Sequence, residues 1–162
     1  ALLLAHGNVY VANVDGQLFK PLEADDGLDL PVLMGLPAPE KQDAQTRDDN
    51  IRITREAIGL ALDLAAHSAA LGQLQEIYHH PNLGWSVVTS GALEADEAMT
   101  IHLGREPLRR ISVARQVVAQ LKRRTRVPKI IWVDGNKNPD RVHVRFADAR
   151  DDNSETYIAT AR

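Results

Sequence analysis

The residues that could do chemistry lie in one polar loop and one pair of histidines. The loop from Asp134 to Asp140 carries oxygen-bearing side chains at alternate positions, as the start of a calcium-binding loop does. Pro139 replaces the glycine of that motif and Arg145 stands where a bidentate glutamate should close the site, so we interpret the loop as a turn. His79 and His80 are adjacent, which on a strand sends their side chains to opposite faces, and no further ligands follow at a metal-binding spacing. The sequence therefore predicts no metal site and no cofactor.

A candidate nucleophile stands in Gly84-Trp85-Ser86, which begins like the nucleophile elbow of an α/β hydrolase. The closing glycine is absent and a strand, not a helix, is expected to follow, so Ser86 is not interpreted as a nucleophile. The chain also lacks cysteine, a phosphate-binding glycine loop and an HExxH pair. These features predict a protein that is not an enzyme.

Positive charge is concentrated between residues 109 and 129. The basic residues there are Arg109, Arg110, Arg115, Lys122, Arg123, Arg124, Arg126 and Lys129. A nucleic-acid or anionic-surface binding domain that uses this basic helix is the alternative function. Against it, the net charge is -3, only 4% of residues are aromatic, and basic residues near a helix C-terminus also complement the helix dipole. We therefore expect a solvated helix face and no bound nucleic acid.

Two helices and several short strands are predicted from the periodicity of apolar residues. One helix should run from about Thr46 to Gly72 and a second from Pro107 to about Arg124, because apolar residues recur at helical spacing in both. Alternating or apolar runs bounded by turn residues predict strands, with residues 22–43 left as a long loop. The predicted strands are 1–5, 8–14, 17–19, 74–78, 84–90, 98–103, 129–134 and 141–146.

This order of elements predicts an α/β (α+β) fold in which a mixed, largely antiparallel sheet carries two main helices. In the final strand, Arg141 to Phe146, valine and phenylalanine alternate with charged residues and histidine, so one face should point inward. Residues 148–162 show no helical period, and we expect a flexible C-terminal tail after a domain that spans residues 1–147.

Four segments, taken in order, resemble the periplasmic β domain of the FtsQ/DivIB cell-division family. They are Tyr10-Val-Ala-Asn-Val-Asp15-Gly16-Gln-Leu-Phe19, Leu30-Pro-Val-Leu33-Met-Gly35, Ile101-His-Leu-Gly104-Arg105 and Trp132-Val-Asp134. The resemblance covers residues 8 to 147. It implies that the chain is the last module of a single-pass inner-membrane protein, preceded by a cytoplasmic tail, a transmembrane helix and a POTRA domain, and that it lies in the periplasm.

The resemblance also implies a function in the divisome, the assembly that carries out septation. Members of the family are not enzymes, and they connect early division proteins to the partners FtsB and FtsL. In the family FtsB adds a strand to the exposed edge of the last strand, a β-augmentation. The matching residues here are Trp132, Asp134, Arg141, Val142, His143, Val144, Arg145 and Phe146.

This chain departs from the family pattern directly after Asp134. Family members continue with Leu-Arg-Tyr and a short glycine turn, whereas this chain has Gly135-Asn136-Lys137 and a longer loop. We therefore expect the backbone edge of residues 141–146, more than any single side chain, to carry partner binding. The acidic tail after Asp148 could partly shield that edge.

Overall fold

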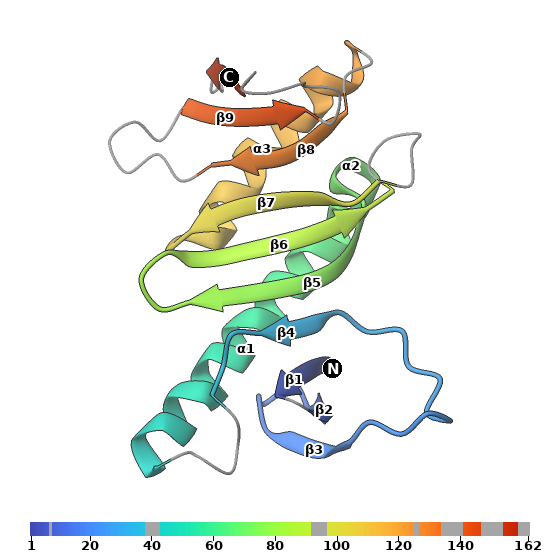
Figure 1. The fold of residues 1–162 in the computed structure, drawn as a ribbon, viewed down its shortest axis with the longest axis vertical. Helices are drawn as coiled ribbons and strands as arrows, with labels where there is room; N and C mark the ends of the chain where they lie inside the picture. Colours follow the sequence, from blue (N-terminus) through green and yellow to red (C-terminus); the bar gives the residue numbers. More distant parts are fainter. Residues whose placement is uncertain are drawn as a thin grey trace.

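One long sheet forms the body of the chain (Figure 1). The computed structural model describes residues 1–6, 8–37, 43–91, 97–124, 127–133, 141–146 and 154–158, and all structural statements below concern these residues. Within them the sheet has ten strands in the order β10-β9-β8-β7-β6-β5-β4-β1-β2-β3. The strands are β1 (Leu2–His6), β2 (Asn8–Ala12), β3 (Leu18–Pro21), β4 (Val32–Met34), β5 (Gln73–His80), β6 (Gly84–Ser90), β7 (Met99–Gly104), β8 (Pro128–Trp132), β9 (Arg141–Phe146) and β10 (Ser154–Ile158).

The sheet is mixed and largely antiparallel, which confirms the predicted fold class. Strand β4 runs parallel to both β1 and β5, and β7 runs parallel to β8, whereas the other neighbouring pairs are antiparallel. Each parallel pair of consecutive strands needs a crossover connection, and helices supply it here. Helices α1 (Ala44–Ala66) and α2 (Ser68–Leu71) connect β4 to β5, and α3 (Pro107–Lys122) connects β7 to β8.

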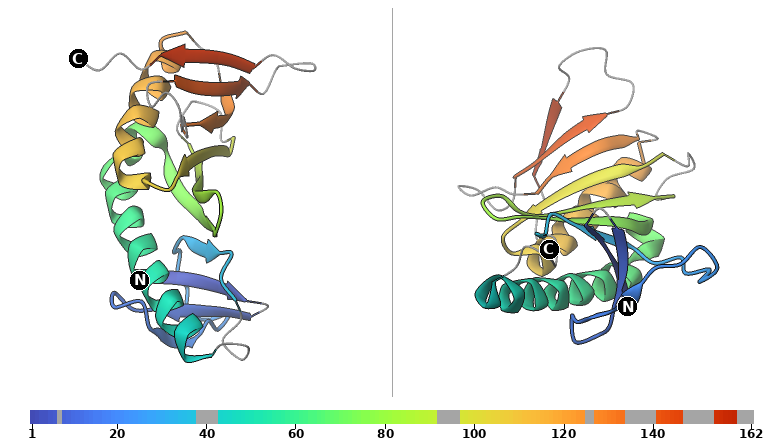
Figure 2. Two further views of the ribbon diagram at one scale, coloured as in Figure 1. Left: turned by 90° about the vertical axis from the view of Figure 1, so that its left-hand side faces the viewer. Right: turned by 60° about the horizontal axis from the view of Figure 1, so that its bottom comes forward.

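Both main helices cover the same face of the sheet (Figure 2). Strands β4 and β7 point in the same direction, and each crossover moves one strand toward β10. Two right-handed crossovers with this geometry necessarily place their helices on one face. The opposite face of the sheet carries no helix of the described chain, and we call it the open face.

The helices begin and end at residues whose chemistry explains the boundaries. Asp43 caps α1 by accepting a hydrogen bond from the backbone N–H of Thr46 at 2.7 Å. The expected helix to Gly72 is interrupted at His67, and a short α2 follows before Gly72 ends it with a φ of +85°. In α3 the apolar residues at helical spacing Ile111, Ala114, Val117, Val118 and Leu121 are buried, whereas Leu108 in the first turn is 58% exposed.

The segment predicted to be a loop between residues 22 and 43 contains a strand. Val32–Met34 forms β4 in the interior of the sheet, and Leu33 is completely buried between β1 and β5. Three residues are too few to show an alternating pattern, so periodicity could not reveal this strand. Strand β5 also continues to His80, beyond its predicted end at Tyr78.

The core lies between the helices and the covered face of the sheet. It is mainly aliphatic and unites both ends of the sheet in one cluster. Leu60 and Leu64 of α1 and Leu121 of α3 are at most 1% exposed. Burial of a side chain of this size contributes about 1.5–3 kcal/mol, so these residues hold the helices on the sheet.

Candidate functional site

The strand predicted to bind a partner is β9, near one end of the sheet. Its side chains alternate as expected, because Val142 and Val144 are completely buried and Phe146 is 4% exposed, while the residues between them are exposed. The exposed side chains are Arg141, His143 and Arg145, which lie on the open face. A partner could therefore touch these three side chains, whereas the buried residues could contribute only their backbone groups.

The expectation that β9 ends the sheet is wrong. Strand β10 lies antiparallel along its outer side, with Ser154 opposite Arg145 and Ile158 opposite Arg141. The edge of the described sheet is therefore β10, and the outer backbone groups of β9 are already paired within the chain. Ser154–Ile158 falls inside the segment expected to be a flexible tail, and the remainder of that segment lies outside the described residues.

One aromatic side chain fixes β10 to the rest of the domain. Tyr157 is 9% exposed, and its ring lies edge-on to the ring of Phe146 with centroids 6.5 Å apart. The guanidinium of Arg124 lies 6.0 Å from the centre of the same ring, within the range of a cation–π interaction. The Tyr157 hydroxyl donates to a carboxylate oxygen of Glu155 at 2.8 Å.

Trp132 ends β8 on the open face. Two hydrogen bonds hold the backbone of the next residue, Val133. The Val133 N–H donates to the carbonyl of His102 at 2.9 Å, and the Val133 carbonyl accepts from Arg110 Nη1 at 2.8 Å. These bonds tie the end of β8 to both β7 and α3. Asp134, the next predicted site residue, lies outside the described residues, as does the loop to Asp140.

Strand register brings six open-face residues into one line across the sheet, which we call the transverse row. Each member lies directly opposite the next on the neighbouring strand, from β5 to β10. The transverse row consists of Tyr78, Ser86, His102, Trp132, His143 and Thr156. Cross-strand neighbours on one face interact directly, so the row joins the middle of the sheet to its β10 end.

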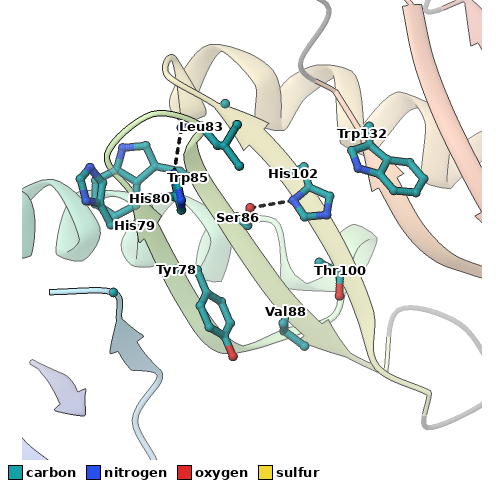
Figure 3. A pocket seen from close by; sticks show the side chains of 12 residues that line it. Tyr78, His79, His80, Leu83, Trp85, Ser86, Val88, Thr100, His102 and Trp132 are labelled. Atoms are coloured by element: carbon teal, nitrogen blue, oxygen red, sulfur yellow. Dashed lines mark hydrogen bonds between the residues drawn. The ribbon is translucent and has the colours of Figure 1, made fainter. Parts of the chain in front are cut away.

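Three contacts within the transverse row involve its two histidines, and Figure 3 shows the residues of the two contacts that His102 makes. Ser86 Oγ lies 2.8 Å from His102 Nδ1, and the His102 ring stacks on Trp132 with centroids 5.6 Å apart. At the edge, Thr156 Oγ1 lies 3.2 Å from His143 Nδ1. Sequence reasoning missed the row entirely, because its members are scattered over residues 78 to 156 and only the register aligns them.

A concave pocket of about 730 Å³ lies over the middle of the transverse row. Tyr78, Leu83, Ser86, His102 and Trp132 line part of it, and burial there lowers the pKa of His102 below its ordinary value of 6.5. The serine–histidine contact is the arrangement a nucleophile needs, but among the described residues no acidic side chain bonds His102 to orient its ring. Aromatic and hydroxyl side chains line the pocket.

The basic helix face is partly occupied by structural contacts. Arg110 binds the Val133 carbonyl, Lys122 donates to the carbonyl of Ala69 at 3.2 Å, and Arg124 lies over the Tyr157 ring. Arg109 lies 3.7 Å from a carboxylate oxygen of Glu106. These contacts give several of the basic residues a role in holding the fold together.

Two features are absent from the described part of the chain. No helix there has the length and apolar character needed to cross a membrane. No group of three or more histidine and carboxylate side chains gathers there in a way that could hold a metal ion.

Many protein-interaction domains bind other chains through an open sheet face or a strand edge, and the described residues of this chain include both. The chain belongs to the FtsQ/DivIB family of cell-division proteins, because residues 1–145 match the family described as "Cell division protein FtsQ/DivIB, C-terminal".

A relative from Anaeromyxobacter sp. (strain K), described as "Cell division protein FtsQ", is 28% identical over 153 residues. The aligned part covers 93% of this chain and 49% of the relative, so the chain spans about half the length of this relative. The family match ends at residue 145, and β10 lies outside it.

Proposed function

We propose that this chain is a non-enzymatic interaction domain of the divisome that binds FtsB and FtsL through strand addition at the β8-β9-β10 end of its sheet. The observation that supports this most directly is the end of the sheet: β10 has five residues and pairs with β9 alone among the described strands, so an unpaired strand edge is present there, that of β10 or, once β10 detaches, that of β9. Unpaired strand edges are templates for the addition of a strand from another chain.

The open face beside this edge would select the partner by charge. Arg141, His143 and Arg145 are exposed there, and neither arginine forms an ion pair within the described residues. Trp132 lies in the adjacent strand, opposite His143. A strand that adds at this end would therefore meet a basic surface next to an aromatic side chain, and acidic residues in the partner would complement it.

The proposal includes a location. Family membership supports a domain on the periplasmic side of the inner membrane, carried by a longer protein with a single transmembrane helix. The gene sequence upstream of residue 1 tests this part: it should encode a segment of ~20 apolar residues followed by a POTRA-like module.

Titration of the purified chain with the extracytoplasmic parts of FtsB and FtsL tests the binding proposal. The double variant Arg141→Glu/Arg145→Glu should weaken binding at least about tenfold, because it reverses the charge of the open face at the edge. Arg109→Glu/Arg115→Glu makes the same charge change on the exposed side of α3 and should leave binding unchanged. If the α3 variant loses affinity and the β9 variant does not, the binding surface is the basic helix face.

A further inference from the structure

Strand β10 covers almost the whole outer side of β9. Its five residues pair in register with Arg141 to Arg145. We infer that β10 occupies the place of the partner's strand, and that a partner displaces β10, pairs with β9 itself and inserts a large aromatic or apolar side chain where Tyr157 now lies. This inference rests on the proposed function and specifies the surface that the partner uses.

Strand β10 is attached to the domain less extensively than its neighbour. Strand β9 lies between β8 and β10, whereas β10 has a neighbouring strand on one side only among the described residues. Of the β10 side chains the structure describes, Tyr157 is buried, Glu155 is half-buried and Thr156 is exposed. Short edge strands with little buried side chain open at a lower free energy than the core of a sheet. Displacement of β10 would leave the rest of the sheet intact.

The site under Tyr157 belongs to other elements and would remain when β10 leaves. Phe146 at the end of β9 presents its ring, and Arg124 beyond the end of α3 presents its guanidinium. Val142 lies directly opposite Tyr157 across the strand pair. An aromatic ring in this place gains an edge-to-face contact and a cation–π contact at once. The site therefore favours an extended segment with an aromatic side chain directed to the helix-covered face.

On the open face, β10 places no negative charge directly opposite the two arginines of β9. Arg141 lies opposite Ile158 and Arg145 lies opposite Ser154, so neither arginine faces a carboxylate across the strand pair. A foreign strand with Asp or Glu at these two positions would make cross-strand ion pairs that β10 cannot make. Such a strand, acidic on the open face and aromatic on the covered face, would compete successfully with β10.

The family match agrees with this assignment. Matched residues extend through Arg145 in β9 and stop before β10. Strand β10 therefore lies outside the matched residues, and without it β9 would be the edge of the described sheet.

A reversible cross-link between β9 and β10 tests whether displacement is needed. His143 and Thr156 are exposed and directly opposite, with Nδ1 and Oγ1 3.2 Å apart, and the chain contains no cysteine. Opposed residues in antiparallel strands have Cα atoms about 4.5–5.5 Å apart, a separation that a disulfide can bridge. In the full chain His143→Cys/Thr156→Cys, oxidation would therefore lock β10 in place, and thiol titration would report closure.

We expect the reduced form to bind the extracytoplasmic part of FtsB, co-produced with FtsL, and the oxidised form to bind at least about tenfold more weakly. Equal or tighter binding by the oxidised form would overturn the inference and indicate addition to the outer edge of β10. The variant His143→Ser/Thr156→Ser controls for loss of the two side chains. Tyr157→Ala, which loosens β10 without a cross-link, should bind more tightly than the unchanged chain, and weaker binding would also overturn the inference.

Hydrogen exchange of the chain alone separates failure of this inference from failure of the proposed function. The amides of β10 should exchange faster than those of β7 and β8, and oxidation of the cysteine variant should slow them. If β10 exchanges as slowly as β7 and β8, the strand does not detach and the inference is wrong. If β10 opens but the unchanged chain and Tyr157→Ala both fail to bind FtsB with FtsL, the proposed partner is wrong.

Discussion

His102 and Trp132 stack across the parallel strands β7 and β8, with ring centroids 5.6 Å apart and planes inclined by 16°. This contact joins two regions that the sequence separates by thirty residues: the pocket in the middle of the open face and the strand edge proposed to bind a partner. Trp132 lines that pocket and also lies opposite His143 of β9. A substitution at Trp132 would therefore affect both the pocket and the strand edge.

Replacement of Trp132 by Ala should weaken binding of FtsB and FtsL and lower the free energy of unfolding by about 1–2 kcal/mol, since the stacked ring and its buried area are lost. Calorimetric titration and urea denaturation measure the two effects. Tyr78→Ala, at the far end of the transverse row, is the control, and it should leave partner affinity unchanged. Equal loss of affinity in both variants would extend the binding surface over the whole pocket.

Stability should decrease as the pH falls below about 6.5. Burial lowers the pKa of His102, and burial is also the largest cause that lowers the pKa of His79. The folded chain then binds fewer protons than the unfolded chain, so the stabilisation is complete above the unfolded pKa of 6.5 and is lost as the pH falls toward the folded pKa.

Urea denaturation at about pH 7.5 and about pH 5.5 measures this dependence in a range above the ordinary carboxylate pKa values. His102→Gln should show a smaller decrease in the free energy of unfolding than the unchanged chain does. An identical decrease would mean that His102 titrates normally in the folded protein.

Thr89→Val should stabilise the chain by about 1 kcal/mol. Thr89 in β6 is completely buried, and its Oγ1 has no hydrogen-bond partner within the described residues. Valine has the same shape and removes the cost of the unsatisfied hydroxyl. Ser86→Ala, in the same strand, removes a hydroxyl that contacts His102 and should cost about 1 kcal/mol. The midpoint of thermal or urea unfolding should therefore rise in Thr89→Val and fall in Ser86→Ala.

Gly84→Ala should be far more destabilising than Gly91→Ala. Both glycines have a positive φ, +83° and +70°, so alanine should cost about 1–2 kcal/mol at either position. A Cβ at Gly84 would also lie 2.3 Å from the backbone of Gly104, whereas a Cβ at Gly91 has nothing within 4 Å. We expect a further loss of at least about 2 kcal/mol at Gly84, and comparable unfolding midpoints would show that β6 and β7 can separate there.

The elements with a long periodic pattern were predictable, and the short ones were not. Alternation in β9 and helical spacing in α1 and α3 identified these elements, because one side of each is buried over several repeats. Strand β4 has three residues and β10 has one buried aromatic, so neither pattern repeats. The candidate site was consequently placed on β9, which forms a strand at the predicted residues but does not end the sheet.

The sequence by itself determined the fold class, the two main helices and the inward face of β9, because side-chain polarity at a fixed period is a local property. It also indicated the family, through four segments that occur in the family's order. Only the tertiary structure decided that β10 covers β9, that Tyr157 lies between Phe146 and Arg124, and that the transverse row exists. These features depend on strand order and register, which arise from packing between residues distant in the chain. They decide which backbone edge a partner would meet first.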